Sequence, residues 1–334
     1  MESYLAVIWA GIIGLAVAMY VILDGFDLGI GILFPFADNE HERDQMMNTV
    51  APFWDGNETW LVLGGAGMMV VFPLAYSIIM PALYLPVIIM LLALVFRGVA
   101  FEFRWIGVTS KPHWTFAFAA GSALAGFCQG IILGGLIQGI TVKDNAFAGG
   151  PFDWATPFAM LCGVALVVGY GLLGATWLVL KTDGVVAERA RMQAKTLLLA
   201  VLACMVVVSV WTPLAFERIA ARWFSFPNIL FLWWVPVATA LVALAIWHWL
   251  GTRRDVLPFL GTIALFLLGY LGLLISNYPY LVPPSLTIWE TAAATPTQIF
   301  MLMGTLVMLP IIIGYVVFVY WTFGGKLREG EGYH

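Results

Sequence analysis

Residues 5–34 read LAVIWAGIIGLAVAMYVILDGFDLGIGILF, an almost unbroken apolar run whose only charged residues are Asp24 and Asp27. A helix needs about 20 predominantly apolar residues to cross the hydrocarbon core of a bilayer, because no water there can satisfy free backbone groups. This run is long enough to cross and to tilt. It has no basic residues before its apolar core and is too long for the core of a signal peptide, so we expect it to remain as a membrane helix.

The composition of the 334-residue chain supports the same conclusion. Hydrophobic residues make up 62% of it and charged residues 10%, against about 45–50% and about 25% in soluble globular proteins. These proportions exclude a soluble enzyme and a disordered chain, and the net charge of −4 offers no basic surface for nucleic acid. The three cysteines stand apart within apolar runs, so we expect neither a disulfide framework nor a metal site. The sequence predicts an all-α, polytopic membrane protein.

The same length criterion, applied along the whole chain, predicts nine membrane spans. They cover residues 5–34, 59–75, 77–103, 115–140, 155–180, 196–216, 228–250, 257–275 and 299–323. The second span is short and leads through a tight turn into the third, so these two are expected to form an antiparallel pair. No loop is long enough to hold a soluble domain, so residues 1–334 are expected to form a single membrane domain.

Lysine and arginine residues predict the direction of insertion, since they stay on the cytoplasmic side. Placing the N-terminus outside leaves eleven basic residues inside: Arg43, Arg104, Lys111, Lys181, Arg189, Arg191, Lys195, Arg253, Arg254, Lys326 and Arg328. Three basic residues then fall outside (Lys143, Arg218 and Arg222), and Arg97 lies within a span. We therefore expect an external N-terminus and, after nine spans, a cytoplasmic C-terminus.

Charged residues inside spans are the strongest functional signal, because each one costs roughly 2.5–3.5 kcal/mol at mid-bilayer. They come in three pairs: Asp24 and Asp27 in the first span, Asp55 and Glu58 at the entry to the second, and Arg97 and Glu102 toward the end of the third. The i, i+3 spacing of Asp24 and Asp27 places both on one helix face, and the glycines beside them permit a close helix approach. The predicted topology brings all three pairs to the cytoplasmic side. Five crowded, desolvated carboxylates favour proton binding while Arg97 keeps a neighbour ionised, which predicts a proton-handling site.

Structural roles for the same residues are the alternative interpretation. The two aspartates of the first span can bond to backbone or to Arg97 as helix-packing groups, with Arg97 acting only as a charge partner. Asp55 can cap the second span, with Glu58 completing an arrangement like a capping box. Glu102 can pair with its neighbour Arg104. These alternatives do not exclude proton handling.

The remaining polar residues argue against a redox centre in this chain. The histidines are predicted in loops, at a span end or at the terminus, at positions 41, 113, 248 and 334. No two are expected to face each other across a membrane core, so we expect no haem with two histidine ligands and no haem–copper centre. Gln129 and Gln138 of the fourth span are interpreted as hydrogen-bonding links between helices.

Three ordered motifs carry a family resemblance. They are DGFDLGIG at residues 24–31, WDGNETWL at 54–61 and FRGVAFEFR at 96–104. Together they closely resemble subunit II of the bacterial cytochrome bd-type quinol oxidases. The lead-in TVAP at 49–52 is most similar to the cyanide-insensitive terminal oxidase branch. The resemblance is specific over roughly residues 20–105.

The resemblance implies a respiratory complex of the bacterial inner membrane that oxidises quinol and reduces dioxygen to water with cytoplasmic protons. The haems, two b-type plus a d-type or a third b-type, are expected in the partner subunit I, and a small single-helix accessory subunit is a further candidate partner. The implied fold is a four-helix bundle in residues 1–140, a second in 155–275 and a peripheral helix in 299–324. The N-terminus would be periplasmic.

The resemblance also implies roles for individual residues. Asp55, in the WDGN motif, is associated with a proton path toward subunit I, aided by Glu58, Asp24 and Asp27. A structural quinone bound near Trp54 is a further expectation. A proton-coupled transporter subunit and a purely structural scaffold remain the competing interpretations, since carboxylates with an arginine partner also occur in transporters.

Overall fold

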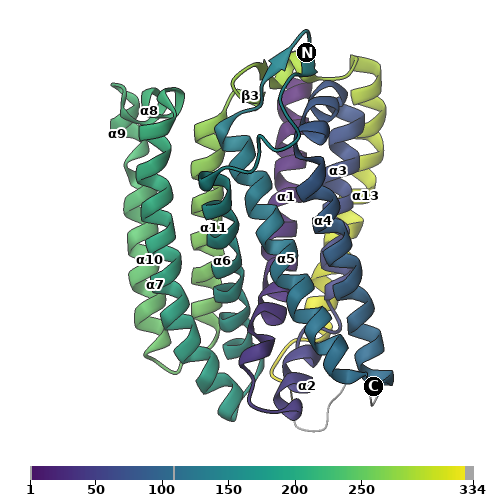
Figure 1. The fold of residues 1–334 in the computed structure, drawn as a ribbon, viewed down its shortest axis with the longest axis vertical. Coiled ribbons are helices and arrows are strands. Elements are labelled where there is room, and N and C mark those ends of the chain that lie inside the picture. Colours follow the sequence, from purple (N-terminus) through teal and green to yellow (C-terminus); the bar gives the residue numbers. More distant parts are fainter. Residues whose placement is uncertain (1, 108–109, 328–334) are drawn as a thin grey trace.

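The computed structural model describes residues 2–107 and 110–327. Arg328 and His334, which the sequence predictions include, lie outside these ranges. Within them the chain is largely helical, with two short hairpins of paired strands. Figure 1 shows the long helices lying side by side in one bundle. The all-α membrane architecture predicted from the sequence is confirmed.

The helices and strands follow one another in a simple order along the chain. They are α1 (Glu2–Leu33), η1 (Phe34–Phe36), α2 (Glu40–Asn48), α3 (Trp54–Val71), α4 (Pro73–Ile106), α5 (Lys111–Gln138), β1 (Val142–Lys143), β2 (Ala146–Phe147), α6 (Pro157–Lys181), α7 (Gly184–Ala215), α8 (Glu217–Phe224), α9 (Asn228–Leu232), α10 (Trp234–Leu250), α11 (Val256–Asn277), β3 (Tyr280–Val282), β4 (Leu286–Thr287), α12 (Ile288–Thr291) and α13 (Thr295–Thr322). β1 pairs with β2, and β3 pairs with β4, both antiparallel.

The number of spans is close to the nine predicted. Eight stretches of the described chain are helical, long and apolar enough to cross a membrane, and α3 corresponds to the remaining predicted span. α3 has 18 residues, which extend about 27 Å at 1.5 Å per residue, close to the thickness of the hydrocarbon core. It begins at Trp54 rather than at residue 59, so polar residues occupy its first turns. α4 begins at Pro73 rather than at residue 77, since proline is favoured at a helix start.

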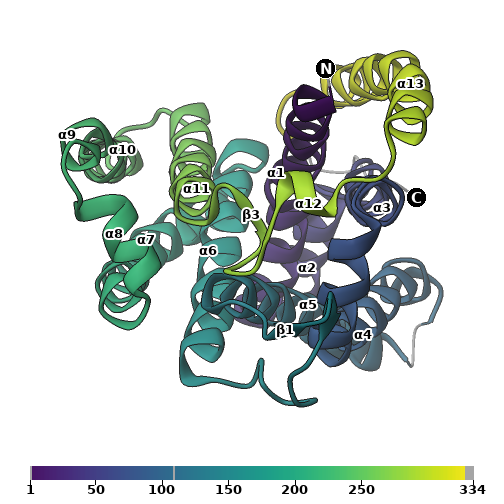
Figure 2. The same cartoon turned by 90° about the horizontal axis from the view of Figure 1, so that it is seen from above.

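The long helices form two groups that share an interface. α1, α3, α4 and α5 pack together, and α6, α7, α10 and α11 lie beside them (Figure 2). The groups meet where α6 contacts α1 and α5. A Cβ atom on Gly29 would lie 2.0 Å from the carbonyl oxygen of Tyr170, so glycine is required where α1 crosses α6. The close helix approach predicted from the glycines beside the two aspartates is therefore present.

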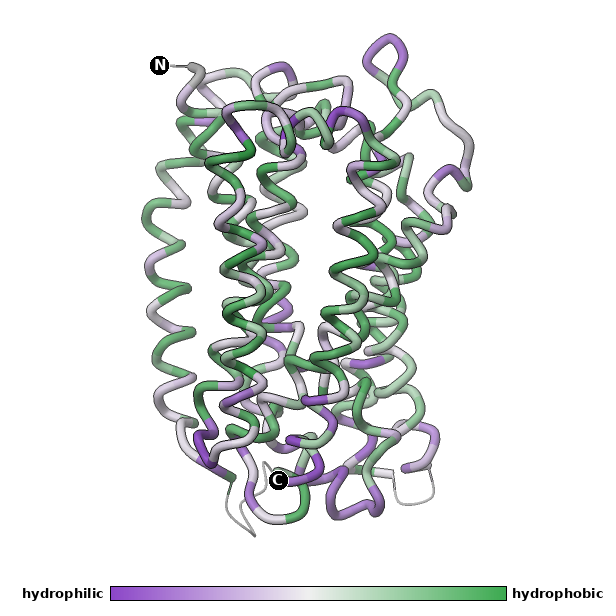
Figure 3. The backbone as a smooth tube through the Cα atoms, turned by 90° about the vertical axis from the view of Figure 1, so that its left-hand side faces the viewer, coloured by the Kyte–Doolittle hydropathy of each residue, from purple (hydrophilic) through white to green (hydrophobic). Residues whose placement is uncertain are grey.

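The two ends of the bundle can be told apart by their connections. The N-terminus and β3 lie at one end, and α2 lies at the other, together with the last described residues (Figure 1). We refer to these as the β3 end and the α2 end. The middle of the bundle is mainly hydrophobic, while hydrophilic residues gather at both ends (Figure 3). This distribution is the one expected of a protein that spans a bilayer.

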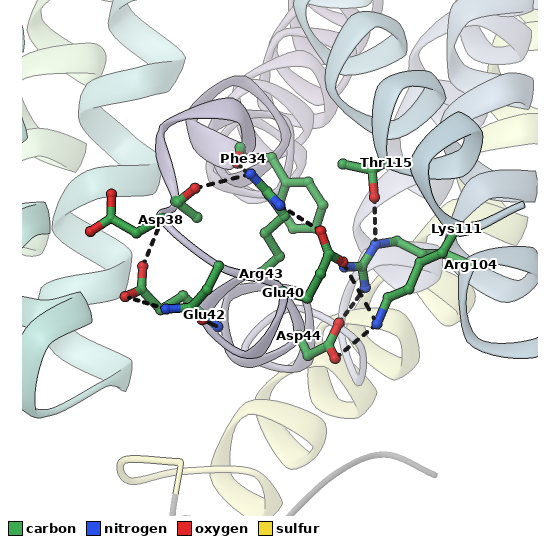
Figure 4. Close-up of polar contacts among 11 residues, drawn as sticks. Phe34, Asp38, Glu40, Glu42, Arg43, Asp44, Arg104, Lys111 and Thr115 are labelled. Carbon is green, nitrogen blue, oxygen red and sulfur yellow. Dashed lines mark hydrogen bonds and ion pairs between the residues drawn. The ribbon is translucent and has the colours of Figure 1, made fainter. Parts of the chain in front are cut away.

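A belt of ion pairs fastens α2 to both groups of helices, and Figure 4 shows its contacts with Arg104 of α4 and Lys111 of α5. It consists of Asp38, Glu40, Glu42, Asp44, Arg104, Lys111 and Arg189. Arg104, at the end of α4, pairs with Glu40 at 2.7 Å, and Arg189 of α7 pairs with Glu42. The helix itself is capped by Asn39, whose side chain accepts a hydrogen bond of 2.9 Å from the backbone of Glu42. The belt therefore connects α4 to α7 beneath the end of α1.

Candidate functional site

Arg97 of α4 is the centre of a charged cluster buried inside the bundle. Its guanidinium lies 2.8 Å from Asp24 Oδ1 and 3.9 Å from Asp27 Oδ2, and the side chains of all three residues are fully buried. Glu58 of α3 lies 3.6 Å from the same guanidinium, and its side chain is 31% exposed. The structure thus brings residues from α1, α3 and α4 together as predicted, and Glu58 is the member through which water can reach the cluster.

Local helix geometry explains why these side chains meet. Asp24 and Asp27 are three residues apart on α1, so both face α4. α5 packs tightly against α4 beside Arg97, at Gly121, where an added Cβ would lie 2.7 Å from the carbonyl oxygen of Ala93 and 3.4 Å from Arg97 Cβ. The small residue on α5 lets α4 lie close, and the long arginine side chain extends inward from it.

Asn57 joins the cluster, although the sequence analysis did not single it out. Its amide nitrogen donates hydrogen bonds to Asp27 Oδ2 at 2.7 Å and to the backbone oxygen of Leu23 at 3.3 Å. Its amide oxygen accepts a hydrogen bond of 3.0 Å from the hydroxyl of Tyr320, on α13. The sequence offered one indication of its role: Asn57 lies two residues after Asp55 in the WDGN segment, so the two side chains are on opposite faces of α3.

A neutral hydrogen-bonded chain continues from the cluster toward α6. The hydroxyl of Tyr20, one helical turn before Asp24, interacts with that carboxylate. Gln129 of α5 donates to the Tyr20 hydroxyl at 2.7 Å and accepts from the Tyr170 hydroxyl at 2.6 Å. Gln129 therefore links α1, α5 and α6. The interpretation of this glutamine as a link between helices is confirmed.

The charged cluster is held by attraction between charges more than by aligned hydrogen bonds. Among the described residues, neither carboxylate oxygen of Asp24 and none of the guanidinium nitrogens of Arg97 has a well-aligned hydrogen bond. Removing such groups from water is costly unless opposite charges compensate. Three carboxylates around one guanidinium leave that compensation incomplete when all are ionised.

Asp55 lies beside the cluster rather than inside it. It is the second residue of α3, and its side chain is exposed. The first turn of α3 is preceded by Phe53 as N-cap, with no side-chain cap hydrogen bond. The interpretation of Asp55 as a helix cap with Glu58 completing a capping box is therefore wrong, because the helix begins at Trp54, two residues earlier than a cap at Asp55 requires.

Glu102 and Trp54 also lie outside the buried cluster. Glu102 is exposed, and Arg104 pairs instead with Glu40 and other members of the belt, so the expected pairing of Glu102 with Arg104 is not formed. Glu102 lies five positions after Arg97, so its side chain leaves α4 in a direction about 140° away from that of Arg97 around the helix axis. Trp54 stacks on Phe101 with ring centroids 5.1 Å apart, and it keeps part of its surface exposed.

The histidines of the described chain are placed poorly for a metal or haem. His41, His113 and His248 are all exposed, and no group of three or more candidate metal ligands occurs among the described residues. None of these three histidines faces the interior of the described chain.

The fold and the site together define a class: a polytopic helical membrane protein with a buried carboxylate–arginine cluster that is accessible through one glutamate. Residues 5–323 match the family model of the cytochrome bd terminal oxidase subunit II. The chain belongs to this family. Membership as a subunit II implies a complex with a subunit I.

Known proteins with similar sequences cover nearly the whole chain. It is similar to cytochrome bd-I ubiquinol oxidase subunit 2 of Escherichia coli strain K12, with 28% identity over 97% of this chain and 95% of that protein. It is 27% identical to cytochrome bd ubiquinol oxidase subunit 2 of Bacillus subtilis strain 168, with 97% of each chain covered. Its fold matches a chain in the structure of the bd oxidase from Geobacillus thermodenitrificans, with a TM-score of 0.78, 18% identity and coverage of 96% and 98%.

Proposed function

We propose that this chain is the haem-free subunit II of a respiratory quinol:dioxygen oxidoreductase and that it takes up protons for the complex from the cytoplasm. The observation that carries the proposal is the fully buried group of Asp24, Asp27 and Arg97 with the partly exposed Glu58 beside it. A partly hydrated carboxylate next to a buried cluster is an arrangement suited to moving protons from water into a protein.

The orientation follows from the positive-inside rule. Those basic residues predicted to be cytoplasmic that the structure describes belong to α2, to helix ends near it, to the first part of α7 and to the segment after α13, which lie at the α2 end. Arg218 and Arg222 of α8 and Lys143 of β1 belong to the other end. We therefore place the α2 end in the cytoplasm, the N-terminus in the periplasm and the C-terminus in the cytoplasm.

The first step in this mechanism is proton capture at the surface. Asp55 is exposed and precedes Glu58 by three residues, so both carboxylates lie near one another at the start of α3. A proton passes from Asp55 to Glu58 and then to Asp24 and Asp27. Both of these buried aspartates pair with Arg97. Because three carboxylates and one guanidinium cannot all stay ionised comfortably away from water, the cluster binds and releases protons as one unit.

The redox chemistry belongs to the partner in this proposal. The names of the relatives specify ubiquinol oxidases, so quinol and dioxygen are the proposed substrates of the complex, and its haems would carry electrons to dioxygen. The exposed histidines of this chain support the placement of those haems in subunit I. The partly exposed ring of Trp54 is the proposed contact for a structural quinone. The sequence motifs favour a cyanide-insensitive enzyme. Oxygen uptake measured in the presence of cyanide tests this expectation.

The test is a substitution at the surface of the path in the intact complex. Asp55→Asn and Glu58→Gln should each lower quinol-driven oxygen consumption while the haem spectrum of the purified complex stays unchanged. Glu188→Gln is the matched control, because Glu188 is 70% exposed and its ion pair with Arg191 is a loose 3.9 Å contact. Unchanged turnover in both variants would refute proton uptake by this route. Loss of haem would favour the scaffold interpretation.

A further inference from the structure

The peripheral helix α13 packs on the rest of the chain along its middle through Leu309, Ile312 and Val316, and hydrogen bonds hold it near both ends. Gln298 is its only buried residue, and the backbone oxygen of Gln298 accepts a hydrogen bond of 3.2 Å from Trp9 Nε1. At the α2 end, Lys181 Nζ donates to the backbone oxygens of Phe323 at 2.6 Å and Gly325 at 3.1 Å. The second attachment fixes the last turn of α13 against α6, close to the charged cluster.

Tyr320 lies within this second attachment. Its ring stacks on Phe53 with centroids 4.5 Å apart and an angle of 28° between the planes. The rings of Phe26 and Trp177 meet it edge-on at 6.5 Å and 6.3 Å. Three aromatic neighbours from separate parts of the chain therefore hold the ring, which fixes where its hydroxyl points.

The hydroxyl of Tyr320 points to Asn57, and Asn57 points to Asp27. The hydroxyl donates to Asn57 Oδ1 at 3.0 Å, and Asn57 Nδ2 donates to Asp27 Oδ2 at 2.7 Å. The two ends of a primary amide turn together, so an oxygen held by a donor on one side forces the NH₂ group to face the other. A donor aimed at a carboxylate stabilises its ionised form.

We propose that Tyr320 is a positioning residue: its hydroxyl orients Asn57 so that the amide donates to Asp27 and favours the ionised carboxylate. The Tyr320–Asn57–Asp27 hydrogen bonds do not depend on the proposed function, whereas the importance of Tyr320 for turnover rests on it. The other groups around Asp27 are Asp24 on the same helix, Glu58 on α3 and Arg97 on α4. None of these contacts is altered when the Tyr320 hydroxyl alone is removed.

The Tyr320→Phe variant isolates this hydroxyl because it keeps the aromatic ring and its stacking on Phe53. Without the donor, only the 3.3 Å hydrogen bond to the Leu23 backbone oxygen and Asp27 itself orient the amide of Asn57, which can then turn and offer its oxygen to a protonated Asp27. One hydrogen bond of ordinary net strength corresponds to about a fivefold change in an equilibrium. We therefore expect about a fivefold higher ratio of protonated to ionised Asp27 at a given pH.

The measurement is infrared spectroscopy of the purified complex across a pH series. The carbonyl stretch of protonated Asp27 is identified as the band that the Asp27→Asn variant lacks. Tyr320→Phe should strengthen this band at each pH. Tyr270→Phe is the matched control, since its hydroxyl donates to the backbone oxygen of Gly14 at 2.9 Å, and it should leave the band unchanged.

A double-mutant cycle shows whether the effect passes through Asn57. In an Asn57→Ala background, Tyr320→Phe should have no further effect on the Asp27 band. A band that is the same in Tyr320→Phe and in the unaltered protein would overturn the proposal, as would an equal effect in both backgrounds. The band does not depend on turnover, so a positive result here together with normal turnover in both Asp55→Asn and Glu58→Gln would reject only the proton-uptake function.

Discussion

Gly174 of α6 lies against Gly29 of α1 so closely that a Cβ atom on Gly174 would lie 2.4 Å from the carbonyl carbon of Gly29. The obstacle is backbone, which cannot rotate away as a flexible side chain can. The same crossing places Tyr170 next to Gly25, so the contact between the two groups of helices also sets the position of the neutral hydrogen-bonded chain that runs from Tyr20 through Gln129 to Tyr170.

We therefore expect Gly174→Ala to separate α1 from α6 and to destabilise the protein by about 3 kcal/mol, the upper part of the usual range for overpacking. Thermal unfolding of the purified complex measures this. Gly269→Ala on α11 is the control, since nothing lies within 4 Å of a Cβ at that position. Equal melting temperatures for the two variants would contradict the backbone contact.

Arg97→Gln is expected to be more damaging than the loss of any single carboxylate of the cluster. It leaves Asp24 and Asp27 buried without a counter-charge, and breaking a buried ion pair from one side costs about 3–5 kcal/mol. Adding Asp24→Asn to Arg97→Gln should restore part of the yield and of the melting temperature, because it removes one of the unpaired charges. A double variant no more stable than Arg97→Gln would show that the guanidinium acts by packing rather than by charge.

The ion-pair belt at the α2 end should make stability depend on acidic pH. Partial burial raises the pKa of Glu40 and Glu42, but hydrogen bonds and charges from their arginine partners outweigh it and hold both below their ordinary 4.5. A lowered carboxyl pKa means that the stabilisation is fully present above about pH 4.5 and is lost as pH falls through the folded-state value.

Substituting both residues with glutamine should lower the melting temperature by about 1–2 °C at neutral pH, the effect of roughly 1 kcal/mol in a chain of 334 residues. The difference from the unaltered protein should disappear below the folded-state pKa, where the native carboxylates are protonated too. High salt should reduce it at neutral pH, because Glu40 is 49% exposed and its interactions are screened. A difference that is constant across pH would contradict the belt.

The sequence was sufficient to predict the membrane architecture and the meeting of Asp24, Asp27 and Glu58 with Arg97. The predicted convergence of five carboxylates was wrong for the exposed Asp55 and Glu102. Long apolar runs are forced into helices by the absence of water, so their number and approximate limits follow from hydropathy. The i, i+3 spacing of Asp24 and Asp27 fixed their common face, and the topology brought α4 and Arg97 to them. The start of α3 was placed too late because its first turns are polar, which makes them resemble a loop.

The parts of the site that could not be predicted depend on helix rotation and on contacts distant in sequence. Asp55 and Asn57 are two residues apart, so they lie about 200° apart around the helix axis, and only packing decides which faces inward. The contact of Tyr320 with Asn57 joins residues far apart in the chain. No local sequence pattern predicts that the end of α13 packs against the start of α3.

The sharing of Arg97 by two aspartates of α1 also has a consequence for how the chain enters the membrane. α1 is synthesised before α4, so for a time its two carboxylates have no guanidinium nearby and their burial is unfavourable. Translation therefore delivers the acidic helix ahead of its counter-charge. The final depth of the first helix is settled only when the arginine-bearing helix arrives, which makes α1 and α4 a single unit of membrane assembly.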